Sequence, residues 1–245
     1  MSKEIEKLIT NIAVVEGMNL HEAFTIWLEM SARSIFGGTL KMMAAEDAWR
    51  ENEDAYLNIV GRFRKKDISA NQAAKALKVL IDAFETHRTD ILGPLFMELA
   101  SNKYQGQFFT PFEVCKLMAG LTINDVKPQI EQEGFVLMSE PACGAGAMVI
   151  ATSETLLEQG VDINRQVHWV MTDVSWPAIC AAYIQCSLLG ISADIVHGNT
   201  LTLEEWQRMP TPMAVLYPKF KSKQTPVTNT GTYGDLVNNI MEAAE

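Results

Sequence analysis

Hydrophobic and polar positions follow one spacing in the first hundred residues and another spacing after them. Side chains in 21–36 recur every three or four residues and place one stripe on a helix: Phe24, Trp27, Leu28, Ser31 and Ile35. A second stripe runs through 69–87, after a serine that can cap a helix: Ala73, Leu77, Leu80 and Phe84. The basic stretch 61–67 between them is typical of a solvated turn. The pattern predicts an all-helical N-terminal region.

From residue 106 onward, short apolar runs rich in β-forming residues alternate with helical stretches. The runs lie at 135–141, 167–174, 193–199 and 213–218. Helical stretches at 145–160 and 176–190 separate the first three runs. Strands that alternate with helices of this length are typical of βαβ units in a parallel sheet.

The sequence therefore predicts an α/β fold with a truncated, Rossmann-like parallel sheet of about four strands behind the helical region. We place the boundary near Tyr104, which gives a helical region at 1–104 and a Rossmann-like domain at 105–245. Within that domain, the end of the chain is expected to form a turn-rich loop at 221–234 and a short helix at 235–245.

A glycine-rich loop joins the first predicted strand to the helix after it. The loop reads Pro141-Ala142-Cys143-Gly144-Ala145-Gly146 and follows Glu140. Glycine lets the backbone approach a ligand closely, and ligands of open α/β sheets bind at the carboxyl ends of the strands. The second strand ends in Asp173 and the third in Asn199, at that same edge. A carboxylate after the second strand can accept from ribose hydroxyls, so the pattern favours a nucleotide-like ligand over a bare tight turn.

Composition and charge restrict the partners and the compartment. With 48% hydrophobic and 20% charged residues the chain is an ordinary globular protein, and its net charge of −10 does not attract DNA by itself. The four cysteines form no C-x-x-C pair and have no histidine at ligand spacing, which predicts reduced thiols, no metal and a cytoplasmic protein. No signal peptide and no apolar run of membrane-spanning length is found, so we expect no membrane association.

Several elements that stand in the order of one known family carry a resemblance. Glu140 to Gly146 resembles motif I of the S-adenosylmethionine-dependent adenine-N6 DNA methyltransferases, and Asp173 and 193–201 are similar to their motifs II and III. The stretches 90–99 and 106–121 resemble elements that precede motif I in the modification subunits of type I restriction-modification systems. The resemblance covers about 88–203 and implies S-adenosylmethionine as the cofactor and DNA as the substrate.

The resemblance also implies a role for each matching position. Phe109, Thr110 and Pro111 would contact the methionine end of the cofactor. The amino acid and the sulfonium would be lined by the motif I positions Glu140, Pro141, Ala142, Cys143, Gly144 and Gly146. Asp173 would hold the ribose and Val174 would pack on the adenine. Asn199 stands where the family commonly has an aspartate, and its amide oxygen can still accept from the adenine amine.

The family's catalytic motif departs from its usual form in this chain. The family has Asn or Asp, Pro, Pro and an aromatic residue after its fourth strand, where the amine of a flipped adenine is read. Aligned on the run at 213–218, these positions hold Tyr217, Pro218, Lys219 and Phe220. Tyr217 replaces an amide acceptor with a phenol, and no other Asn-Pro-Pro or Asp-Pro-Pro occurs in the chain. The basic cluster 219–223 is more typical of a solvated loop than of a phosphate contact.

Three functions remain open from the sequence. The first is an adenine-N6 DNA methyltransferase that meets DNA weakly alone or through a partner subunit supplying target recognition. The second is a catalytically silent pseudo-methyltransferase that binds the cofactor as a regulator, decoy or partner subunit. The third is a small-molecule methyltransferase with Tyr217 or His197 as its base. A self-association that covers the sheet edge, giving a homo-oligomer, also stays open.

Overall fold

The N-terminal region is helical throughout in the computed structural model, which describes residues 2–99, 109–123 and 125–218. Its helices are α1 (Ser2–Glu16), α2 (Leu20–Met42), α3 (Glu46–Gly61), α4 (Lys66–Phe84) and α5 (Leu92–Leu99). Asn19 caps α2, because its side-chain oxygen accepts from the backbone N–H of Glu22 at 2.8 Å. The two predicted stripes lie on α2 and α4, and most of their side chains are buried. The prediction of a helical region is confirmed.

The second part of the chain alternates strands and helices. In order it contains α6 (Phe112–Thr122), α7 (Lys127–Glu133), β1 (Val136–Glu140), α8 (Ala147–Glu158), β2 (Val167–Asp173), α9 (Trp176–Leu188), β3 (Ala193–Asn199), β4 (Glu204–Pro210) and α10 (Pro212–Leu216). The strands form one sheet in the order β1-β2-β3-β4. β1, β2 and β3 run parallel, with Val136 opposite Val167 and Trp169 opposite Ala193. The predicted α/β class and the first three strands are confirmed.

The fourth strand is not where the sequence predicted it. Residues 212–216 form the helix α10, and the fourth strand is β4, which pairs antiparallel with β3. Pro212 stands in the first turn of α10, where a missing N–H costs nothing and the fixed φ suits a helix. Because β4 lies at the edge of the sheet and its first residues are exposed, it lacks the apolar run by which a buried strand is identified.

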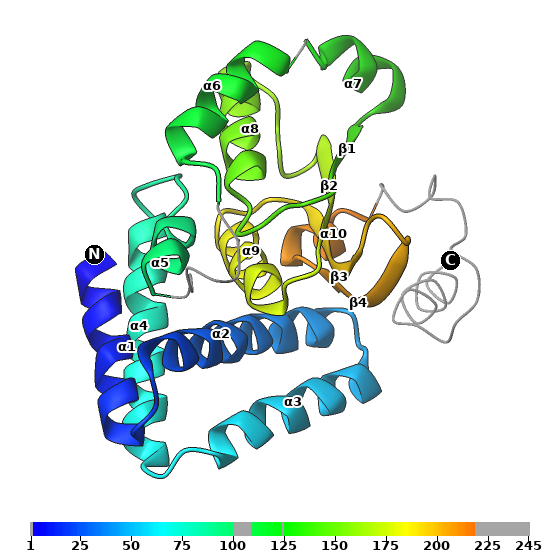
Figure 1. Cartoon of the computed structure of the whole chain (residues 1–245). Coiled ribbons are helices and arrows are strands. Elements are labelled where there is room, and N and C mark those ends of the chain that lie inside the picture. Colours follow the sequence, from blue (N-terminus) through cyan, green and yellow to red (C-terminus); the bar gives the residue numbers. More distant parts are fainter. Residues whose placement is uncertain (1, 100–108, 124, 219–245) are drawn as a thin grey trace.

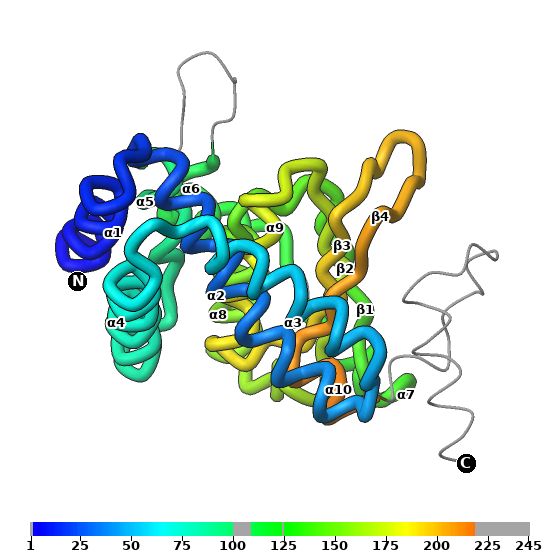
Figure 2. Tube along the Cα trace, turned by 90° about the horizontal axis from the view of Figure 1, so that it is seen from below, coloured from blue at the N-terminus to red at the C-terminus, as the bar shows by residue number. Residues whose placement is uncertain are grey.

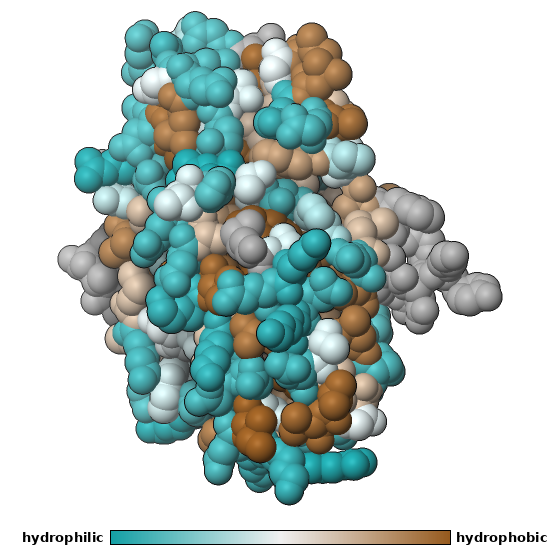
Figure 3. Space-filling view, turned by 90° about the vertical axis from the view of Figure 1, so that its left-hand side faces the viewer, coloured by the Kyte–Doolittle hydropathy of each residue, from teal (hydrophilic) through white to brown (hydrophobic). Residues whose placement is uncertain are grey.

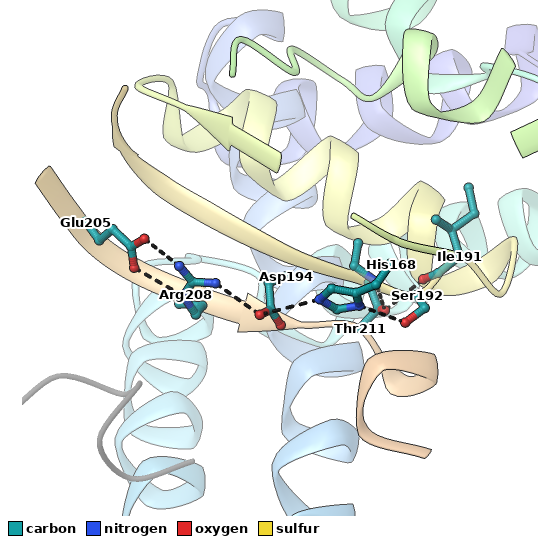
Figure 4. Close-up of polar contacts among 8 residues, drawn as sticks. His168, Ile191, Ser192, Asp194, Glu205, Arg208 and Thr211 are labelled. Carbon is teal, nitrogen blue, oxygen red and sulfur yellow. Dashed lines mark hydrogen bonds and ion pairs between the residues drawn. The ribbon is translucent and has the colours of Figure 1, made fainter. Parts of the chain in front are cut away.

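A buried ion pair holds β4 against β3. Arg208 of β4 donates to Asp194 of β3 at 3.0 Å (Figure 4). Asp194 is almost completely buried. Glu205 accepts from the same guanidinium, so Arg208 donates to two carboxylates at once. A register shift between His197 and Gly198 bends the pair, and a Cβ at Gly198 would lie 2.3 Å from the carbonyl oxygen of Glu204. The hairpin therefore depends on a charge pair and a glycine.

The helical region packs on the α/β part through α2. Helix α9 lies between the sheet and α2, and α3 lies on the outer side of α2 (Figures 1 and 2). The ring of Phe36 meets the ring of Tyr183 edge-on at 5.7 Å, and the Tyr183 hydroxyl is 2.9 Å from Thr39 Oγ1. One cluster of buried side chains runs through both parts. This shared core fixes the helical region relative to the strands.

The surface of the protein is polar where the N-terminal helices are exposed. The face that carries α1 and α4 is largely hydrophilic, and its apolar areas are separate (Figure 3). Within the described ranges, no helix combines the length and the apolar character that crossing a membrane requires. Several predicted features lie outside the described residues: the boundary at Tyr104, Phe220, the basic cluster 219–223, the loop 221–234 and the helix 235–245.

Candidate functional site

The glycine-rich loop between β1 and α8 has a backbone that only glycine adopts easily. Gly144 has a φ of +52° and Gly146 a φ of +95°, both in the left-handed region. A Cβ on Gly144 would also lie 3.0 Å from two ring carbons of Phe109, so the loop and that ring are in close contact. The loop therefore presents bare backbone beside an aromatic wall.

One carboxylate joins this loop to the end of β2. Asp173 Oδ2 accepts from the backbone N–H of Gly144 at 2.9 Å, and Oδ1 accepts from that of Ser175 at 2.8 Å. The N–H of Cys143 donates to the carbonyl of Thr172 at 2.9 Å. A carboxylate has about four acceptor positions, so Asp173 can hold both loops and still accept from a ligand. The sequence placed Asp173 at this edge and gave no sign of its contact with the loop.

A pocket of about 160 Å³ opens beside the loop. Its lining comes from the segment before α6, the first turn of α6, the end of β1, the loop and the start of α8: Phe109, Thr110, Cys115, Glu140, Ala142, Cys143, Gly144, Ala145, Ala147 and Met148. Glu140 supplies the carboxylate of this lining, which suits a cationic group such as an ammonium or a sulfonium. The structure thus brings together the predicted residues of the methionine end, apart from Pro111, Pro141 and Gly146, which flank the pocket's lining.

Two thiols line the pocket, and neither is activated. Burial raises the pKa of Cys143 well above its usual range, and the charge of Asp173 adds to this shift. Burial likewise raises the pKa of Cys115, with a further contribution from Asp90. Because the thiolate is the reactive form, both side chains act as small apolar groups here. The sequence did not single out Cys115, although it stands only a turn beyond the predicted Thr110 and Pro111.

The residues that the sequence predicts to contact the adenine lie at the ends of β2 and β3. Val174 is 56% exposed, so its side chain is free to pack against a flat ring. Asn199 turns its amide oxygen toward the next turn, where it accepts from the backbone of Leu201 at 3.0 Å and of Thr202 at 3.3 Å. Thr200 Oγ1 donates to the carbonyl of Pro141 at 2.6 Å. This oxygen of Asn199 is therefore already engaged, which the sequence did not foresee.

An aromatic cluster, which the sequence did not predict, lies beside the carboxyl ends of β2 and β3. The ring of His197 lies 5.3 Å from that of Trp176 and 4.8 Å from that of Trp206. The guanidinium of Arg33 lies over Trp176 at 5.4 Å, so α2 reaches the start of α9. His197 Nε2 is also 3.2 Å from the carbonyl oxygen of Val174. These contacts hold His197 in place between two indoles.

The structure does not bring Tyr217 to the loop. Tyr217 follows α10, and its hydroxyl accepts from Arg165 at 3.3 Å. Arg165 precedes β2, whereas Asp173 ends it, so the length of β2, about 20 Å at the usual rise per residue, separates Tyr217 from the carboxyl edge of the sheet. Pro218 follows Tyr217 directly. The alignment placed both residues at the end of a fourth strand predicted at 213–218, whereas residues 212–216 form the helix α10.

The described residues hold no metal cluster: no group of three or more His, Cys, Asp or Glu side chains in 2–99, 109–123 and 125–218 is placed to bind a metal ion. The pocket beside the loop, with one carboxylate and bare backbone, is suited instead to an organic ligand with a cationic centre.

Comparison with known proteins identifies the family. No match was found among curated proteins. A solved structure described as a class I S-adenosylmethionine-dependent methyltransferase from Listeria monocytogenes is 17% identical, with a TM-score of 0.45 over 78% of this chain. That match covers 51% of the other chain, so the present chain spans about half of its length. A sequence profile of the N-6 DNA methylases matches residues 90–242, which is more than half of the chain. The chain therefore belongs to the N-6 DNA methylase family.

Proposed function

We propose that the chain binds S-adenosylmethionine in the pocket beside the glycine loop and takes part in adenine-N6 methylation of DNA. The observation that carries the proposal is the join between Asp173 and Gly144, which sets a ribose-binding carboxylate against bare loop backbone. The pocket adds Glu140 for the cationic end of the cofactor. Family membership supplies the reaction class.

The size of the pocket supports binding of one end of the cofactor there. A volume of about 160 Å³ is smaller than the roughly 300 Å³ or more of sites that enclose a whole drug-sized ligand. We assign it to the methionine end, with Phe109 and Thr110 as one wall. The ribose and adenine would then lie outside it, over Asp173 and the exposed Val174. The amide N–H₂ of Asn199 is the group left to face the adenine, since its oxygen accepts from the turn.

We infer that the isolated chain transfers methyl groups to DNA poorly. Adenine-N6 transfer requires acceptors placed on both hydrogens of the amine, and the sequence has no Asn-Pro-Pro or Asp-Pro-Pro to supply them. Tyr217 lies near the opposite edge of the sheet, beside Arg165. The net charge of −10 also gives no general attraction to DNA. A partner subunit that supplies target recognition would remove the second deficit.

The position of Tyr217 favours one alternative function. A chain that binds the cofactor and lacks an amine-reading group would serve as a silent regulatory or partner subunit of a restriction-modification or related system. This alternative shares the cofactor site with the first proposal and differs in the chemistry. The two are separated by a transfer assay and not by a binding assay.

The proposal is tested by titration calorimetry with S-adenosylmethionine, run beside transfer of a labelled methyl group to DNA. We expect binding by the full chain and an affinity at least about tenfold lower in Asp173→Ala, because charge-assisted hydrogen bonds contribute about 1.5–3 kcal/mol each. The control is Asp82→Ala, which removes an exposed acid paired with Lys78 on α4. Equal affinity in Asp173→Ala and the wild type would contradict the cofactor assignment. Strong methylation by the chain alone would exclude the silent alternative.

A further inference from the structure

One buried glutamine connects the cofactor loop to the start of α5. Gln185 of α9 is completely buried, and its Nε2 donates to the carbonyl of Ala145 in the loop at 2.9 Å. The same nitrogen donates to Asp90 Oδ1 at 2.8 Å. Its Oε1 accepts from the backbone N–H groups of Ile91 at 2.8 Å and Leu92 at 3.0 Å. An amide offers two N–H donors and two acceptor positions, and here all four are used.

Asp90 fixes the other end of this connection. Its Oδ1 also accepts from the N–H of Gly93 at 2.8 Å, in the first turn of α5. A Cβ on Gly93 would lie 2.0 Å from Asp90 Oδ2, so the carboxylate occupies the space that another residue would fill. Helix α5 is therefore joined by hydrogen bonds to α9, and through Gln185 to the cofactor loop.

A second contact leads from α5 to the same loop from the other side. The ring of Phe96 on α5 lies 4.9 Å from the ring of Phe109, which is the wall against Gly144. The backbone N–H of Phe109 donates to the sulfur of Met97 at 3.4 Å. Thus α5 supports the wall of the pocket with its aromatic side chain and holds the loop through Gln185.

We propose that Gln185, held by Asp90, is a positioning residue that fixes the cofactor loop against α5, so that α5 is a structural part of the cofactor site. The claim rests on the proposed function for its link to S-adenosylmethionine. Its structural part does not: loss of the Gln185 amide should loosen the loop in the free protein as well. A buried carbonyl left without a donor is costly, and the loop can avoid that cost by moving.

The test compares two buried residues of α9 in the full chain. Gln185→Met keeps the length of the side chain and removes all four hydrogen bonds. Tyr183→Phe is the matched control, because its hydroxyl bonds Thr39 and the carbonyl of Pro210, both away from the loop. Hydrogen exchange of the free protein is followed in the peptide that contains Cys143 and Gly144. We expect at least about tenfold faster exchange there in Gln185→Met and the wild-type rate in Tyr183→Phe.

Binding of S-adenosylmethionine is then measured on the same proteins. Gln185→Met should bind about tenfold more weakly, while Tyr183→Phe should bind as the wild type does. If Gln185→Met does not fold, Asp90→Ala takes its place, and Asp90→Asn, which keeps the Oδ1 acceptor, should restore the wild-type loop. Equal loop exchange in Gln185→Met, or in Asp90→Ala, and in the wild type would overturn the positioning role. A wild type that binds no cofactor while its variants still differ in loop exchange would overturn the proposed function alone.

Discussion

Both edges of the sheet carry polar and acidic residues, which are partly exposed at one edge and buried at the other. At the carboxyl edge of the parallel strands, Asp173 and Glu140 are partly exposed beside a pocket and an open loop. At the amino edge, His168, Ser192 and Asp194 are buried. His168 Nδ1 is 3.0 Å from Ser192 Oγ, and its Nε2 is 3.7 Å from Asp194 Oδ2 (Figure 4).

The composition of the amino edge is that of a hydrolytic triad, yet its geometry is that of a structural network. Ser192 has no exposed surface, so no substrate reaches its hydroxyl. Asp194 is paired with Arg208, and Thr211 nearby accepts from the N–H of Ala193 while donating to the carbonyl of Ile191. The difference teaches that access and unused hydrogen-bonding capacity, and not residue type, distinguish the edge that we propose as the binding site.

The largest effect is expected from breaking the buried pair at the amino edge. Arg208→Ala leaves Asp194 buried without its guanidinium, which should lower the free energy of unfolding by about 3–5 kcal/mol. Urea denaturation measures the loss. The control Arg50→Ala removes an exposed pair with Glu46 on α3 and should cost no more than about 1 kcal/mol. If Arg208→Ala also weakened cofactor binding while folded, the two edges would not be separate in function.

At the carboxyl edge, a single methyl group should weaken cofactor binding. Gly144→Ala places a Cβ in a left-handed conformation and 3.0 Å from the Phe109 ring, so we expect about a tenfold loss of affinity by calorimetry. Gly38→Ala on α2 is the control, since its Cβ meets nothing within 4 Å. That change should stabilise the protein by about 0.5–1 kcal/mol and leave affinity unchanged. Tight binding by Gly144→Ala would show that the loop moves freely.

A series of stability measurements at different pH tests Asp90, which lies where the helical region meets the α/β part of the chain. Burial raises the pKa of Asp90 above its ordinary 3.8, against the hydrogen bonds from Gln185 and Gly93. The folded state then binds more protons than the unfolded state, so this group's contribution to stability falls as pH rises from about 3.8 through the raised pKa. Asp90→Asn should flatten that part of the curve and stabilise the protein at neutral pH. If stability changed with pH as steeply in Asp90→Asn as in the wild type, a group other than Asp90 would be responsible for the pH dependence.

The smallest effect is expected at Tyr217. Its ring stacks with Arg165 at 5.1 Å on an exposed surface, so Tyr217→Asn should change stability by less than about 1 kcal/mol. Because the residue is remote from the loop, the substitution should alter neither cofactor affinity nor methyl transfer. Recovery of adenine methylation in Tyr217→Asn would return this residue to the amine-reading position that the sequence alignment gave it.

The contrast between the edges also explains which predictions from sequence succeeded. The stripes of α2 and α4 and the strands β2 and β3 could be found because most of their residues are buried and their hydrophobic pattern records it. β4 could not, since a short edge strand with Glu204, Glu205 and Arg208 has no apolar run. The apolar run at 213–218 was assigned to a strand, although Pro212 gave a helix-start signal that competed with it.

For this protein the sequence alone determined the family, the helical region followed by a parallel sheet, and the residues of the glycine loop. Those features depend on local spacing and on motifs that are contiguous in the chain. The tertiary structure decided the rest: the contact of Asp173 with Gly144, the turning of Asn199 toward its own turn, the joining of α5 to the loop by Gln185, and the remote place of Tyr217. Each of these relies on which hydrogen-bonding atoms the fold brings together and which it leaves free, and the spacing of residues along a chain does not record that pairing.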